Sequence, residues 1–99
     1  MAYQIEIAET AKGHLKRMNR PSIAQVFGAI RTRLIHEPLV ESRNRKRLRP
    51  NPVAPWELRV GSFRVFYEVK AEDLNTVRIL AVGEKQGSSL LIGGQEVEL

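Results

Sequence analysis

The stretch Trp56-Glu-Leu-Arg-Val-Gly-Ser-Phe-Arg-Val-Phe-Tyr-Glu-Val69 decides the fold of this chain. Apolar and polar side chains alternate on both sides of Gly61-Ser62, a dipeptide typical of the tight turn in a β-hairpin. Because successive side chains of a strand point to opposite faces, the predicted hairpin has two unlike faces. The face predicted to pack carries Trp56, Leu58, Val60, Phe63, Val65, Tyr67 and Val69, and the open face carries Glu57, Arg59, Arg64, Phe66 and Glu68.

Upstream of the hairpin, the spacing of apolar residues predicts one strand and two helices. Tyr3, Ile5 and Ile7 alternate with polar residues, which is typical of a half-buried strand. A short helix follows from Ala8 to Met18, where apolar residues recur at helical spacing. A second helix opens near Pro21 and ends before Pro38. Its apolar stripe consists of Ile23, Val26, Phe27, Ile30 and Leu34.

Two further segments flank the hairpin. Residues 38–55 contain four prolines and are predicted to be an irregular connector. Downstream, residues 76–82 alternate as a third strand, and the run Leu90-Leu91-Ile92 could add a short edge strand. The order β-α-α-β-β-β indicates an α+β fold, with two helices packed on one face of a mainly antiparallel sheet. The length of 99 residues predicts a single domain over 1–99.

The basic residues are concentrated in one segment. The formal net charge is +5, from 16 basic and 11 acidic residues. Residues 43–64 hold seven of the basic residues and one of the acids, Glu57, so this segment accounts for the whole excess. Such a cluster indicates a polyanionic partner. The connector contributes Arg43, Arg45, Lys46, Arg47 and Arg49.

Several functional classes are disfavoured by the residues present. There is no cysteine, and His14 and His36 are isolated, so neither a disulfide framework nor a metal site is expected. No cofactor motif is present. The acidic beginning of the chain does not read as a secretory signal, and no apolar run is long enough to span a membrane. We therefore expect a cytoplasmic protein without metal, cofactor or membrane partner.

The hairpin resembles the central hairpin of the RelE/ParE superfamily of bacterial type II toxins. The shared pattern is Leu-Arg-x-Gly-x-aromatic-Arg-x-x-Tyr, which runs here from Leu58 to Tyr67. Lys46-Arg-Leu-Arg49 is similar to the family's Lys-x-Leu-x run. Ile79-Leu-Ala-Val-Gly-Glu-Lys85 resembles its last strand. The resemblance implies a toxin with an antitoxin partner.

The RelE branch of that family cleaves messenger RNA on the ribosome without metal, through attack of the RNA 2′-hydroxyl on the adjacent phosphate. The resemblance therefore implies a ribosome-dependent endoribonuclease, with Arg64 as phosphate clamp, Arg59 beside it and Lys85 after the last strand. Glu57 is the candidate base. The catalytic set is then Arg64, Arg59, Lys85 and Glu57, with RNA contacts expected from Arg43, Arg45, Lys46, Arg47, Arg49, Phe66 and Arg78.

Two departures from the RNase pattern keep alternatives open. Glu57 occupies a position that is often basic in the active RNases, and Leu90-Leu91 stands where they often carry a tyrosine. These residues favour a ParE-like inhibitor that binds DNA gyrase without nuclease chemistry. The Arg59/Arg64 pair and the basic connector favour the RNase. An inactive domain that binds RNA or antitoxin is the third possibility.

Overall fold

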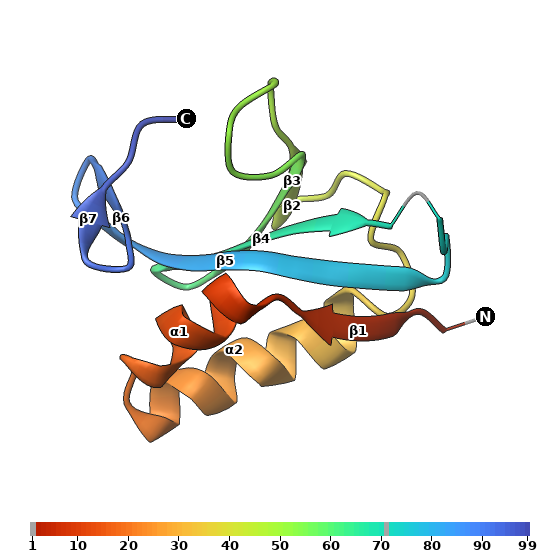
Figure 1. Ribbon diagram of the computed structural model, residues 1–99, viewed down its shortest axis with the longest axis horizontal. Helices are drawn as coiled ribbons and strands as arrows, with labels where there is room; N and C mark the ends of the chain where they lie inside the picture. The colour runs from red at the N-terminus through yellow and green to blue at the C-terminus, as the bar shows by residue number, and fades with distance from the viewer. Residues whose placement is uncertain (1, 71) are drawn as a thin grey trace.

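The computed structural model describes residues 2–70 and 72–99 and has the expected α+β architecture. Both helices lie against one face of a twisted sheet, as Figure 1 shows. On the other side of the sheet, the β2–β3 loop and the C-terminal tail rise toward each other. The elements are β1 (Gln4–Ile7), α1 (Glu9–Lys16), α2 (Arg20–Arg33), β2 (Arg45–Arg47), β3 (Trp56–Val60), β4 (Phe63–Val69), β5 (Thr76–Gln86), β6 (Ser89–Ile92) and β7 (Gln95–Glu96).

The sheet is antiparallel except at one edge. Its strands follow the order β2-β3-β4-β5-β6-β7, and β1 pairs in parallel with β5. The long strand β5 therefore pairs with β4 on one side. On its other side it pairs first with β1 and then, further along, with β6. β1 pairs with residues 76–79 and β6 with residues 83–86, which leaves a short gap between them. The N–H of Val82 lies in that gap and donates to Nδ1 of His14 at 3.2 Å.

The second helix begins as its sequence predicts. The Asn19 side chain accepts a hydrogen bond from the N–H of Ser22 at 2.9 Å, and Pro21 lies in the first turn. Such a cap stabilises a helix by about 1 kcal/mol, and proline fits there because the first helical N–H groups have no partner within the helix. The predicted stripe is also confirmed, since Val26, Ile30 and the C-cap Leu34 are buried. None of the described helices is long and apolar enough to cross a membrane.

The main core lies between the helices and the sheet. It includes the predicted packed face of the hairpin, with Trp56 stacked on Tyr67 at a ring-centroid distance of 6.1 Å. The buried hydroxyl of Tyr67 donates to the carbonyl oxygen of Pro38 at 2.7 Å, which ties the end of the helical layer to the hairpin. The buried members are Ala11, Leu15, Val26, Ile30, Leu34, Trp56, Leu58, Val60, Val65, Tyr67, Val77, Ile79 and Val82.

A second, smaller core covers part of the opposite face of the sheet. It consists of Ala54, Phe66, Ala81 and Leu90, with partly buried apolar neighbours from the β2–β3 loop and β6. The prediction of Phe66 as an RNA contact on the open face was therefore wrong, because this cluster covers it and leaves the residue 0% exposed. The pairing of β4 with β5 shifts between Phe66 and Tyr67, so that Leu80 is skipped, as in a β-bulge.

The connector and the tail contain more regular structure than the sequence predicts. The prediction of an irregular connector was wrong for residues 45–47, which form β2 along the edge of β3. The predicted strand at residues 90–92 is confirmed as β6, and β7 pairs with its outer side. The third predicted strand extends to Gln86 as β5. These additions build two walls above the open face of the hairpin.

Candidate functional site

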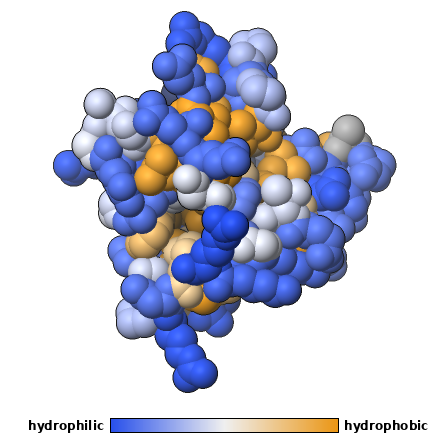
Figure 2. All heavy atoms as spheres, turned by 60° about the vertical axis from the view of Figure 1, so that its left-hand side comes forward, coloured by the Kyte–Doolittle hydropathy of each residue, from blue (hydrophilic) through white to orange (hydrophobic). Residues whose placement is uncertain are grey.

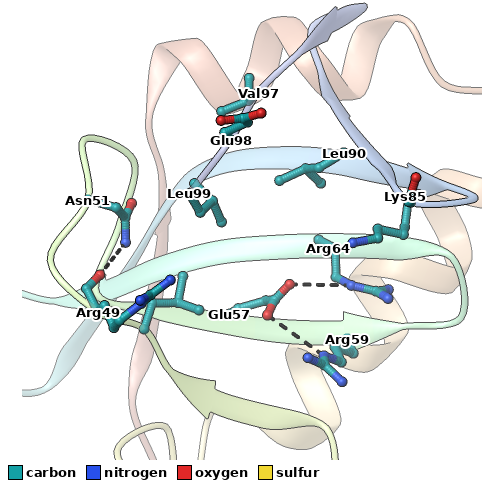
Figure 3. Close-up of a pocket in the computed structure, with 12 residues that line it drawn as sticks. Arg49, Asn51, Glu57, Arg59, Arg64, Lys85, Leu90, Val97, Glu98 and Leu99 are labelled. Carbon is teal, nitrogen blue, oxygen red and sulfur yellow. Dashed lines mark hydrogen bonds and ion pairs between the residues drawn. The ribbon is translucent and has the colours of Figure 1, made fainter.

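A cleft of about 820 Å³ lies on the face of the sheet that the helices do not cover. Its floor is the open face of β3 and β4, and its walls are the β2–β3 loop on one side and the C-terminal segment on the other (Figure 3). All four candidate catalytic residues, Glu57, Arg59, Arg64 and Lys85, line this cleft. The remaining lining residues are Leu48, Arg49, Asn51, Ser88, Leu90, Val97, Glu98 and Leu99.

Strand register brings the charged residues of the floor together. Arg59 lies directly opposite Arg64 across the hairpin, and residues opposite each other in antiparallel strands share a face. Glu57 is two residues from Arg59 on the same strand and therefore points to the same side. The reversal at Gly61, which has a φ of +59°, joins the two strands tightly enough to hold this register.

Glu57 bridges the two arginines. Its Oε1 lies 3.3 Å from Nε of Arg64, and its Oε2 lies 3.7 Å from Nε of Arg59. The side chains of Glu57 and Arg64 are only 10% and 15% exposed, whereas that of Arg59 is 47% exposed. Glu57 thus offsets part of the positive charge of the floor. It also holds the guanidinium of Arg64, whereas its contact with the half-exposed Arg59 is longer.

Arg64 is held by its backbone surroundings as well. Its Nη1 donates to the carbonyl oxygens of Gly61 at 2.8 Å and Phe63 at 2.9 Å. A guanidinium has five N–H donors, one on Nε and two on each terminal nitrogen. These contacts and the Glu57 pair use Nε and Nη1, which leaves Nη2 to bind a ligand. Arg64 is therefore positioned before any substrate arrives.

Lys85 completes the basic part of the cleft from β5. Its N–H donates to the carbonyl oxygen of Ser62 at 2.7 Å, which places the residue beside the hairpin turn. Its side chain is exposed and lines the cleft together with Arg59 and Arg64. Three cationic side chains from three strands consequently converge at one end of the cleft, where Figure 3 shows them.

The basic cluster of the connector is divided between surfaces. Arg49 lines the cleft, and Lys46 lies opposite Glu57, on the same face of the sheet. Arg45 instead donates through Nη1 to the carbonyl oxygen of Arg33 and through Nε to that of Val40, both at 3.0 Å. It fastens the connector to the end of α2. Arg47 lines a separate hollow with Glu68 and Leu80, and Arg43 is exposed.

Arg78 lies apart from the cleft. It is opposite Glu68 on β4 and Glu6 on β1, and its Nε is 4.0 Å from Oε2 of Glu6. Lys70 also binds this Glu6 carboxylate, at 3.1 Å, and that hydrogen bond raises the pKa of the Lys70 ammonium. Although Arg78 shares the open face with the hairpin arginines, it forms a separate charge cluster at the other end of the sheet.

Sequence reasoning missed the walls of the cleft. The β2–β3 loop is ordered by Asn51, whose Oδ1 accepts from the N–H groups of Val53 at 2.8 Å and Ala54 at 3.1 Å. The Asn51-Pro52 pair is a turn signal that could have indicated this loop. The opposite wall consists of Leu90, which lies on the predicted edge strand, and of residues 97–99, which bond to Leu90 and which the sequence prediction left out. Gly93-Gly94 is the local turn signal that could have indicated this return of the chain.

Neither a histidine nor a tyrosine is among the residues that the structure places around the cleft. Tyr67 is buried in the main core, and burial raises the pKa of its hydroxyl. His14 accepts from Val82 beside β6, and burial followed by the charge of Arg17 lowers the pKa of its imidazole. Proton transfer in the cleft would therefore fall to the lysine and the carboxylates. The same cations are well suited to bind a phosphate.

Comparison with known proteins identifies the family. A family model described as the ParE toxin of the type II toxin–antitoxin system parDE matches residues 5–87. The chain therefore belongs to the ParE toxin family. This match confirms the resemblance to the RelE/ParE superfamily, and it spans β1 to the end of β5 with the floor of the cleft. No curated protein sequence matches the chain.

Solved structures of toxin–antitoxin complexes share its fold. A chain in the crystal structure of the RelBE2 toxin–antitoxin complex from Mycobacterium tuberculosis is 28% identical, with a TM-score of 0.71. The match covers 87% of this chain and 100% of that chain. A chain in the archaeal RelE–RelB complex from Pyrococcus horikoshii is 22% identical, with a TM-score of 0.65, and covers 90% of this chain and 100% of that one. The protein is thus a type II toxin by family, and its fold is similar to that of these toxin–antitoxin chains.

Proposed function

We propose that this toxin arrests growth by cleaving messenger RNA on the ribosome, with the cleft as its active site. The observation that carries the proposal is the convergence of Arg59, Arg64 and Lys85 over one pre-positioned floor. In this reaction the RNA 2′-hydroxyl attacks the adjacent phosphorus, and the bond to the 5′ oxygen breaks. Negative charge grows on the phosphate oxygens in the transition state, where fixed guanidinium donors stabilise it most.

Two groups of the cleft are proposed to move the protons. When the phosphate binds, the two arginines would pair with it in place of Glu57. Glu57 would then accept the proton of the 2′-hydroxyl, and Lys85 would protonate the leaving 5′ oxygen. Lys46 and Arg49 lie on the same side of the sheet and would bind neighbouring phosphates. We assign no RNA contact to Phe66, because its ring is buried, or to Arg45, which is fastened to α2.

The proposed partners follow from the family. An antitoxin is supported by the structural match to a toxin–antitoxin complex and would cover part of the basic surface. Action on ribosome-bound messages would place the protein in the cytoplasm.

A second candidate function is inhibition of DNA gyrase without nuclease chemistry. It is favoured by Glu57, which already offsets part of the charge of the two arginines, and by the ParE description of the matching family. In that case the cleft would serve as a binding surface only.

Induced expression of wild type and Arg64→Ala separates these functions. We expect the wild type to arrest growth and to produce new 5′ ends inside translated messages. Arg64→Ala should cleave these messages at least about 100-fold more slowly, which is the usual effect of removing one transition-state donor. Arg31→Ala is the matched control, because Arg31 is exposed on α2 and its loss changes the charge equally. Circular dichroism must show both variants folded, since Arg64→Ala leaves Glu57 buried without its closest cation.

Two results would overturn the proposal that this toxin is a nuclease. Arrest with intact messages and loss of gyrase supercoiling activity would establish the second candidate. Expression without arrest would instead indicate a domain that binds RNA or antitoxin but has no toxic activity.

A further inference from the structure

The C-terminal segment turns back along β6 and forms one wall of the cleft. Gly93 and Gly94 have φ values of +62° and +81°, which favour glycine, and they reverse the chain between β6 and β7. Past β7 the chain runs back along β6, where the N–H of Val97 donates to the carbonyl oxygen of Leu90 at 2.8 Å. We call residues 97–99 the tail strap. Figure 3 shows the tail strap along one side of the cleft, with Leu99 as its labelled residue nearest to the strands that carry Glu57 and Arg64.

The base of the tail strap is anchored and its end is exposed. Nη1 of Arg17, just after α1, donates to the carbonyl oxygen of Gly93 at 2.7 Å, and Ser89 donates to the Glu96 carboxylate at 3.3 Å. Beyond these contacts, Glu98 is exposed and Leu99 is 40% exposed. The tail strap is therefore held at the wall of the cleft by one backbone hydrogen bond and partial apolar burial. Such contacts are individually weak enough for a ligand to displace.

The side chains of the tail strap oppose the binding of a polyanion in the cleft. Its two apolar residues, Val97 and Leu99, line the cleft with Leu90, and the surface on this side of the molecule shows apolar atoms surrounded by hydrophilic ones (Figure 2). Between them Glu98 adds a negative charge at the mouth of a cleft whose floor is basic. Within the described residues Glu98 makes no ion pair, so no neighbouring cation offsets its charge and it repels an anionic ligand that enters the cleft. A polyanion must approach against that carboxylate.

We propose that the tail strap is an autoinhibitory segment, which lowers the affinity of the cleft for polyanions until an incoming phosphate chain displaces it. Where that polyanion is RNA, the inference rests on the proposed function. The position of residues 97–99 in the wall of the cleft does not depend on it, because any phosphate chain small enough to enter meets the same carboxylate and the same apolar side chains.

The test measures binding of two probes, a fluorescent single-stranded RNA and inorganic tripolyphosphate, at about 50 mM salt, where screening is weak. We expect Glu98→Gln to bind both probes about two- to fivefold more tightly, from one charge removed at close range. Deleting residues 97–99 should tighten binding at least as much. Glu9→Gln is the matched control, because Glu9 is exposed on α1 across the sheet and its loss changes the charge equally.

A structural readout distinguishes displacement from a general charge effect. In the full chain, saturating tripolyphosphate should speed hydrogen exchange at the Val97 N–H, because its bond to Leu90 breaks when the strap leaves. Unchanged affinity in both strap variants, or exchange at Val97 that slows with ligand, overturns the autoinhibition. Tripolyphosphate binding that tightens as expected while RNA binds to no variant supports the strap and overturns the nuclease proposal instead.

Discussion

At the scale of single residues, His14 has the most specific structural role outside the cleft. Its Nδ1 accepts the Val82 N–H that neither β1 nor β6 can pair, so this imidazole closes the gap in the sheet next to β5. The bond requires an unprotonated Nδ1. Burial, and secondarily Arg17, lower the pKa of His14 from its ordinary value of 6.5. The unfolded chain therefore takes up the proton before the folded one.

The free energy of unfolding should consequently fall as the pH drops below about 6.5, because His14 then takes up a proton in the unfolded chain. The fall should end once the pH is below the lowered pKa of His14 in the folded chain. Urea unfolding of wild type and His14→Gln at pH 7.5, 6.5 and 5.5 measures this. Any stability advantage of wild type should shrink toward pH 5.5. An NMR titration in which folded His14 protonates at or above 6.5 would contradict the prediction.

At the scale of elements, the pairing of β5 with β6 depends on Gly83. A Cβ there would lie 2.7 Å from the carbonyl oxygen of Leu91 and 2.9 Å from Cγ1 of Ile92, and the first of these is backbone that cannot easily move. Gly83→Ala should therefore lower the free energy of unfolding by about 1–3 kcal/mol, as overpacking typically does. Amide exchange should rise most in β6, because that strand must shift.

The matched control is Gly28→Ala in α2, where a Cβ meets nothing within 4 Å. Alanine in a helix is favoured over glycine by roughly 0.5–1 kcal/mol, so this variant should be more stable than wild type. Both free energies come from urea denaturation. Equal stability of Gly83→Ala and wild type would show that β6 does not approach β5 as closely as described.

Elements were predictable where their signal is local. The α2 stripe and the hairpin alternation carry their own period, so Val26, Ile30, Trp56 and Tyr67 were assigned to the core correctly. β2 has no apolar period, because its three residues are all basic, and it becomes a strand only through its pairing with β3. The burial of Phe66 was missed for a related reason. Alternation gives its face correctly, but what covers that face comes from distant parts of the chain.

At the scale of the whole molecule, the sheet has a core on each side, and the two have different consequences. The main core joins the helices to the sheet, whereas the second core joins the two walls of the cleft to its floor. Ala54 belongs to the β2–β3 loop, Leu90 to β6, and Phe66 lies between them on β4. The charged floor is thus set by strand register, while the shape of the cleft depends on this small apolar cluster.

Substitution of Phe66 should therefore loosen the cleft without loosening the helical layer. Phe66→Ala is expected to cost about 3–5 kcal/mol, a large part of the 5–15 kcal/mol that stabilises a typical domain. Phe66→Leu should stay folded, and its amide exchange should rise in β6 and residues 48–54 more than in α2. Ile30→Val, a small truncation in the main core, is the matched control and should show the reverse pattern. An exchange increase of Phe66→Leu centred on α2 would mean that the two cores are not separate units.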